Sequence, residues 1–124
     1  MRFAVWCLMD AMASSFNRLR ALLDGLNLPD TSEGTSYGTP AFKVKERTFA
    51  RLKDSETLVA MIDSVRKEIL MELAPEIYFQ TEHYRGWSAI LVRLPSIGDD
   101  ELGRILQEAW RYKAPSSTLK LLTH

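Results

Sequence analysis

The chain has 124 residues, a length that suits one domain and is enough to bury one hydrophobic core. Its hydrophobic content of 46% and charged content of 26% are ordinary for a globular protein and exclude a disordered or low-complexity chain. The 16 basic residues balance the 16 acidic ones, so the net charge excludes the overall basic excess that is typical of a dedicated nucleic-acid binder, although not a local one.

The N-terminal stretch MRFAVWCLMDAMASS imitates a signal peptide, but its apolar run is short, and Asp10 lies between that run and the sequence that resembles a cleavage site. Residues 1–13 are therefore interpreted as an N-terminal extension or a misplaced start, with residues 14–124 as a single domain. No stretch approaches the roughly 20 apolar residues that cross a bilayer. The single cysteine, Cys7, excludes an internal disulfide and is interpreted as an ordinary apolar residue in a reducing cytoplasm.

The first predicted helix follows Ser14 and Ser15, which are expected to cap it. Its apolar residues recur at helical spacing, and Leu28-Pro29 close the segment. The stretch PDTSEGTSYGTP that follows is polar and rich in turn residues, so it is predicted to be a loop.

After Pro40 the apolar pattern changes to a period of two, which predicts strands. A first strand leads to a turn at 45–47, and a second strand runs from Thr48 to Leu52, so the two form a hairpin. A third strand is predicted from Thr57 to Ile62.

Asp63 or Ser64 is expected to cap a second helix that Pro75 ends. The residues predicted for its inner face are Val65, Ile69, Leu70 and Leu73.

The stretch IYFQTEHYRGWSAILVRLP is interpreted as two strands joined by a turn at His83–Gly86, with Tyr84 exposed beside the turn. Gly98-Asp99 begins the last helix, and Pro115 ends it. Its predicted inner face consists of Leu102, Ile105, Leu106, Ala109 and Trp110.

The predicted order is helix, three strands, helix, two strands, helix. This order favours an α+β fold, an antiparallel sheet of about five strands with helices packed on one face.

Enzyme chemistry has no visible basis in the sequence. His83 in a turn and the terminal His124 are the only histidines, so neither a catalytic triad nor a typical zinc site can be assembled. The acidic run Asp99-Asp100-Glu101 is interpreted as favourable charge at a helix N-terminus. We therefore expect no enzyme activity, no cofactor and no metal.

Positive charge is concentrated in two places. Residues 43–53 hold five basic residues against Glu46, and residues 104–120 hold four against Glu108. In the simplest interpretation, these charges lie on a solvated sheet face and have no binding role. Alternating charges there also discourage edge-to-edge aggregation.

Three stretches carry a family resemblance: EGTSYGTPAFKVKERTFARL, TEHYRGWSAILVRL and LGRILQEAWRYKAPSS. Together they resemble the MmcQ/YjbR family of small bacterial domains, which are widely labelled as DNA-binding. The resemblance covers about Phe16 to Leu121 and implies a CyaY-like fold with a double-wing arrangement. The wings would be the hairpins at 45–47 and 83–86, although Glu46 stands where family members often have glycine.

The CyaY-like fold also raises iron handling of the frataxin type. That chemistry needs an acidic ridge on the first helix, and this helix offers only Asp24 among Arg18 and Arg20.

The resulting hypothesis is weak binding to the phosphate backbone of double-stranded DNA, with no sequence-specific readout. The expected contact residues are Lys43, Lys45, Arg47, Arg85, Arg111 and Lys113. The alternative is a non-enzymatic module that binds a protein or a small ligand, in a groove near Tyr37, Phe42 and Trp87. A cytoplasmic monomer with no membrane contact is expected in either case.

Overall fold

The structure is a computed structural model that describes residues 2–122, with side chains described from residue 11 onward. The expectations for the Cys7 side chain and for His124 fall outside this described part. Its helices and strands are α1 (Arg2–Leu26), β1 (Thr31–Ser36), β2 (Thr39–Val44), β3 (Arg47–Leu52), β4 (Thr57–Met61), α2 (Ser64–Leu73), β5 (Tyr78–Phe79), β6 (Ala89–Arg93), α3 (Asp99–Lys113) and α4 (Ser116–Leu119). Short 3-10 turns occupy Glu82–Tyr84, Leu94–Ser96 and Lys120–Leu122.

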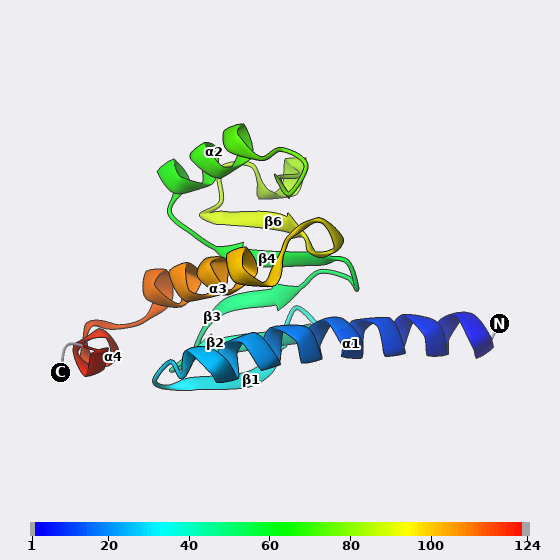
Figure 1. The fold of residues 1–124 in the computed structure, drawn as a ribbon, viewed down its shortest axis with the longest axis horizontal. Coiled ribbons are helices and arrows are strands. Elements are labelled where there is room, and N and C mark those ends of the chain that lie inside the picture. The colour runs from blue at the N-terminus through cyan, green and yellow to red at the C-terminus, as the bar shows by residue number, and fades with distance from the viewer. Residues whose placement is uncertain (1, 123–124) are drawn as a thin grey trace.

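Six strands form one antiparallel sheet in the order β1-β2-β3-β4-β6-β5 (Figure 1). The first of them, β1, lies where the sequence predicted a loop, and that prediction was wrong. It pairs along its whole length with β2, from Thr31 opposite Val44 to Ser36 opposite Thr39. None of its side chains is buried, so this edge strand is held to the sheet by its backbone hydrogen bonds to β2 and not by side-chain burial. Hydropathy alone therefore gave no signal for it.

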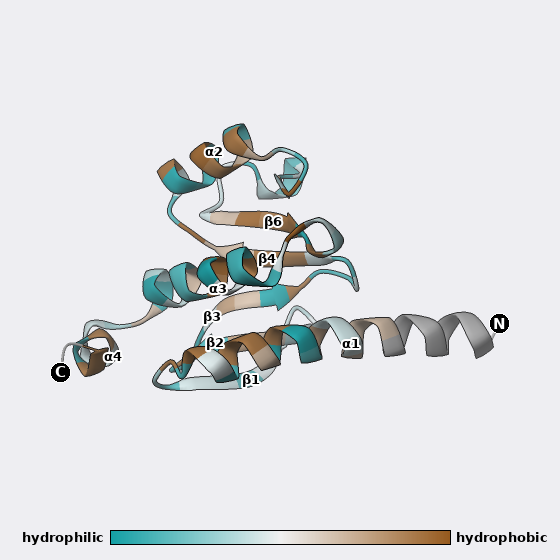
Figure 2. Ribbon diagram, in the orientation of Figure 1, coloured by the Kyte–Doolittle hydropathy of each residue, from teal (hydrophilic) through white to brown (hydrophobic). Residues whose placement is uncertain are grey.

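The long helices cover one face of the sheet, which confirms the predicted α+β arrangement (Figure 1). Arg18 of α1 pairs with Asp99 of α3, and Arg66 of α2 pairs with Glu108 of α3, each at 2.8 Å. The strands between these helices are hydrophobic, whereas the outer side of α3 is hydrophilic (Figure 2). This face therefore holds the main core.

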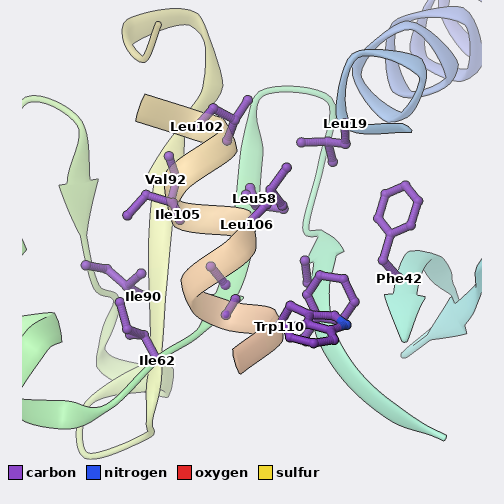
Figure 3. Close-up of a cluster of buried hydrophobic side chains, with 14 of the residues drawn as sticks. Leu19, Phe42, Leu58, Ile62, Ile90, Val92, Leu102, Ile105, Leu106 and Trp110 are labelled. Atoms are coloured by element: carbon purple, nitrogen blue, oxygen red, sulfur yellow. The ribbon is translucent and has the colours of Figure 1, made fainter. Parts of the chain in front are cut away.

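The predicted inner face of α3 is confirmed, since all five of its residues are buried. Leu102, Ile105 and Leu106 point toward the sheet, next to Leu58 and Val92 (Figure 3). Trp110 is fully buried, and its indole nitrogen donates a hydrogen bond to the Pro29 carbonyl oxygen at 3.1 Å. That bond ties the C-terminal half of α3 to the loop that follows α1.

The helix α1 runs through Ser14 and Ser15 without a break, so the predicted cap at these serines was wrong. Ala11, Met12 and Ala13 precede them, and alanine and methionine are strong helix formers. The Ser15 hydroxyl instead donates a hydrogen bond to the Ser55 carbonyl oxygen.

The helix α2 begins at the predicted cap, where the Asp63 carboxylate accepts hydrogen bonds from the amides of Val65 and Arg66. Its predicted inner face was wrong in large part. The exposed fractions of Val65, Ile69 and Leu73 are 65%, 42% and 74%, and only Leu70 of the four is buried. The other buried residue of α2 is Lys67, so the inner face lies on the side of Lys67 and Leu70.

The two predicted turns differ in outcome. The first is confirmed: Lys45 and Glu46 form a two-residue turn between β2 and β3. The second is not a tight hairpin, because β5 and β6 pair only through Tyr78 and Phe79. The connection 80–88 between them contains a 3-10 turn and folds back over the sheet.

Candidate functional site

The sheet face opposite the helices, here called the open face, carries a small second cluster of buried residues. Ala60 and Ile90 belong to the main core, so Val59 and Leu91 beside them point to the open face. Tyr84 packs against this pair from the connection 80–88.

A pocket of about 350 Å³ lies beside this cluster, within the size range of small-ligand sites. Its lining residues are Ser36, Tyr37, Arg47, Thr48, Arg51, Val59, Met61, His83, Tyr84, Trp87 and Lys113. They come from the strands β1, β3 and β4, the turn between β1 and β2, the connection 80–88 and the end of α3. All three stretches that carry the family resemblance contribute to its wall.

The connection 80–88 is held against the sheet by Lys67. Its ammonium group donates hydrogen bonds to the carbonyl oxygens of Tyr84 at 3.0 Å and Trp87 at 2.9 Å. Burial lowers the pKa of Lys67, although the nearby Glu68 carboxylate acts in the opposite direction. A lysine with an exposed fraction of 4% thus fixes one wall of the pocket from behind.

Aromatic rings form that wall. The ring of Tyr84 meets those of His83 and Trp87 edge to face, with centroids 5.0 and 5.3 Å apart. Trp87 is 41% exposed, but Tyr84 is only 4% exposed. The expectation that Tyr84 is exposed was therefore wrong, because its side chain packs against Val59 and Leu91 while Lys67 holds its backbone carbonyl.

Arg51 of β3 connects both walls of the pocket. Its guanidinium donates hydrogen bonds to the Thr39 hydroxyl at 3.2 Å and to the Tyr84 hydroxyl, and its Cζ atom lies 5.1 Å from the centre of the Tyr37 ring. Tyr37 and Gly38 both have positive φ, at 54° and 78°, in the turn between β1 and β2. This turn leaves the Tyr37 side chain 80% exposed above Arg51.

The polar groups of the pocket are mostly hydrogen-bond donors. Arg47, Arg51 and Lys113 contribute positive charge, and no aspartate or glutamate is among the lining residues. The Tyr84 hydroxyl accepts from Arg51 and donates to no other described residue, so it can donate its own proton to a ligand. This arrangement suits a ligand that is flat, anionic and rich in acceptor atoms.

Two of the six predicted contact residues reach this pocket. Arg47 and Lys113 lie together, since the Arg47 guanidinium donates a hydrogen bond to the Lys113 carbonyl oxygen at 3.3 Å. The other four, Lys43, Lys45, Arg85 and Arg111, are not among its lining residues.

The surroundings of those four residues differ. Lys45 pairs with Asp30 at 3.4 Å, and Arg85 pairs with Glu82 at 3.3 Å. Lys43 passes over Gly34 of β1, where an added Cβ would come within 3.3 Å of its Cε atom. Arg111 is exposed on α3.

The predicted groove was right for Tyr37 and Trp87 and wrong for Phe42. Phe42 is buried in the main core, on the helix side of the sheet, where it stacks on Phe16 with ring centroids 4.3 Å apart.

Arg51 was missed as a site residue, although it had been counted in the basic stretch. An extra residue on β3, Phe49, interrupts the alternation, because Phe42 pairs with Ala50 and Lys43 with Thr48.

Two structural features are absent from the described residues. Among them, no three His, Cys, Asp or Glu side chains come together as a set of metal ligands. Within that same part of the chain, no helix is both long and apolar enough to span a bilayer.

Comparisons with known proteins identify a family and a solved structure with a similar fold. The model of a protein family called YjbR matches residues 26–112. The uncharacterized proteins Mb2600 of Mycobacterium bovis and Rv2570 of Mycobacterium tuberculosis are each 36% identical over 62 residues, which are 50% of this chain and 48% of the relative. The chain thus spans about half the length of the curated relatives it matches. The crystal structure of the Deinococcus radiodurans protein DR2400, a DUF419 domain, has a similar fold, with a TM-score of 0.68 and 22% identity over 88% of each chain.

Proposed function

This chain belongs to the YjbR family, and we propose that it binds DNA through phosphate contacts on the open face of its sheet, without a chemical step of its own. The observation that carries the proposal is the charge of the pocket. Arg47, Arg51 and Lys113 meet there without an offsetting carboxylate. Such local charge attracts phosphate groups, because binding releases condensed counterions from the nucleic acid. A DNA ligand would assign the protein to the bacterial cytoplasm.

The proposal moves the main contact from the wing tips to the pocket. Lys45 at the first tip and Arg85 near the second are both engaged by carboxylates, which reduces the charge that they offer to phosphate. Lys43 and Arg111 are proposed as outer contacts, since neither has an ion pair among the described residues.

A second candidate function is the binding of a small ligand without nucleic acid. The size of the pocket and the four aromatic rings among its lining residues favour it. An apolar pocket with few basic groups would have been the sign of this function, however, and here three basic side chains converge on the pocket. The charge therefore favours the nucleic acid.

The test is fluorescence anisotropy of a labelled DNA duplex at 50 and 200 mM salt. From the three pocket contacts alone, the affinity is expected in the micromolar range or weaker and should fall about 40-fold between the two salt concentrations, and the outer contacts would steepen this fall. The double variant Arg47→Glu with Lys113→Glu should abolish binding. Arg104→Glu, an exposed residue of α3 outside the pocket, is the control and should lose little.

Three results would contradict the proposal. One is no binding at low salt, and another is binding that does not depend on salt. The third is an equal loss of affinity in the Arg104→Glu control and in the double variant, with both variants still folded by circular dichroism.

A further inference from the structure

We propose that the pocket on the open face holds one unpaired nucleotide of a single DNA strand, with the base against the aromatic rings and the neighbouring phosphates on the cations. This inference rests on the proposed function and names the form of nucleic acid that the site selects. It predicts a preference for single strands over duplex DNA, whereas phosphate contacts alone predict no such preference.

The pocket can contact the flat face of a base only if that base is unpaired. In a duplex these faces are stacked on neighbouring base pairs, so a protein reaches them only where a base is unpaired. The pocket presents aromatic rings and lies between the Tyr37 turn and the connection 80–88. Its volume of about 350 Å³ suits one nucleotide, whereas the stacked base pairs of a duplex are far too wide to enter it, so a duplex can offer the pocket only its phosphates.

Contacts within the protein orient both rings before a ligand arrives. Trp87 is held by contacts with Tyr84 at 5.3 Å and His83 at 5.2 Å, and its backbone carbonyl accepts a hydrogen bond from Lys67. Tyr37 is held by Arg51 beneath its ring. Yet both rings keep large exposed fractions, 80% for Tyr37 and 41% for Trp87. Exposed rings that are already oriented lose less conformational entropy when a base stacks on them.

The positive charges of the pocket favour a ligand that also carries phosphate groups. With Arg47, Arg51 and Lys113 in the wall and no carboxylate among the lining residues, a cationic or purely apolar molecule gains little there. The phosphates on either side of an unpaired base supply the negative charge, and the free proton of the Tyr84 hydroxyl can meet an acceptor atom of the base or phosphate.

The test compares three labelled oligonucleotides of equal length: a thymidine strand, a strand of abasic sugar-phosphate units, and a duplex. The thymidine and abasic strands have the same backbone charge and differ only in their bases. We expect the thymidine strand to bind at least tenfold more tightly than the abasic strand. It should also bind more tightly than the duplex.

Variants of the aromatic wall assign the effect to the pocket. Trp87→Ala should remove the advantage of the thymidine strand over the abasic strand, whereas Trp87→Phe should keep most of it. Stacking should also quench tryptophan fluorescence in the wild type but not in Trp87→Phe, in which only Trp6 and the buried Trp110 remain. Arg104→Glu should behave as the wild type in every comparison.

The outcomes separate this inference from the proposed function. Equal affinity for all three oligonucleotides would overturn the inference and leave phosphate binding intact. If no oligonucleotide binds, the proposed function is wrong and the inference falls with it, even if free thymidine monophosphate quenches Trp87. That last result would assign the pocket to a free nucleotide.

Discussion

The Tyr84 hydroxyl accepts a hydrogen bond from the Arg51 guanidinium across the open face of the sheet. This bond joins β3 to the connection 80–88, two segments that are far apart in the sequence. Arg51 is also placed against Tyr37, so one side chain orders both walls of the pocket. The shape of the site therefore depends on this contact.

Replacing the acceptor tests that dependence. Tyr84→Phe keeps the ring contacts and removes the hydroxyl, so we expect the free energy of unfolding to fall by about 1 kcal/mol. Tyr112→Phe is the matched control, because Tyr112 is 44% exposed and its hydroxyl makes no hydrogen bond to any described residue. Urea denaturation of both variants measures the difference. Equal stability of the two variants would show that the Arg51 contact contributes nothing.

The corrected inner face of α2 can be tested with two leucines of the same helix. Leu70 is buried in the main core, whereas Leu73 is 74% exposed. We expect Leu70→Ala to lower the free energy of unfolding by about 2–5 kcal/mol and Leu73→Ala to change it by less than about 0.5 kcal/mol. Thermal or urea unfolding distinguishes them. Similar losses in both variants would restore the predicted face of the helix.

Lys67 should give the protein a stability that rises with pH. Burial lowers the pKa of Lys67 below its ordinary value of 10.5, so the unfolded chain binds more protons than the folded protein between the two pKa values. Stability from this group therefore increases as the pH rises through that interval toward 10.5. Subtracting the urea-unfolding free energies of Lys67→Met from those of the wild type, between pH 7 and 10.5, isolates this contribution. A difference that stays constant over the range would contradict the pKa shift.

The same variant reports on the connection 80–88. Without the ammonium group, the Trp87 carbonyl oxygen loses the hydrogen bond from Lys67, and the Tyr84 carbonyl oxygen keeps only the one from the Trp87 amide, at 3.0 Å. We expect faster amide hydrogen exchange at Arg85 and Trp87 in Lys67→Met, and unchanged exchange in β3. Unchanged protection throughout would mean that other contacts hold the connection.

Tyr78 should act in the opposite direction at alkaline pH. Burial, and then the hydrogen bond from its hydroxyl to the Glu101 carboxylate at 2.7 Å, raise the pKa of Tyr78 above its ordinary value of 10.0. The folded protein then keeps a proton that the unfolded chain releases. This stabilising contribution is fully present below about pH 10 and is lost as the pH rises further. Tyr78→Phe should show a shallower loss of stability from pH 9.5 to 11 than the wild type, and an identical slope would argue against the shift.

The helix α3 could be predicted down to its buried residues, because Leu102, Ile105 and Leu106 follow the helical period in a long amphipathic segment. The helix α2 could not. It is short and lies near the β5–β6 edge of the sheet, and the methylene groups of Lys67 occupy an inner position that a hydropathy pattern assigns to solvent. The strand β1 could not be predicted from hydropathy either, because none of its side chains is buried.

The pocket was harder to predict than the fold. The sequence located Arg47 and Lys113 as basic residues and Tyr37 and Trp87 as neighbours of a groove, but it could not bring the two groups together. The two groups come together because of the extra residue Phe49 in β3 and the hydrogen bonds from the buried Lys67 to the connection 80–88. Neither effect follows a period along the chain.

Because the residues that line the pocket come from distant parts of the chain, the melting temperature can report ligand binding. Its wall joins residues 36–61, residues 83–87 and Lys113, so the unfolded chain holds no such site. Any true occupant must then stabilise the folded protein by mass action, by about 2.7 kcal/mol at a concentration of 100 times its Kd. Unlabelled nucleotides and oligonucleotides can therefore be ranked by the rise in melting temperature that each causes.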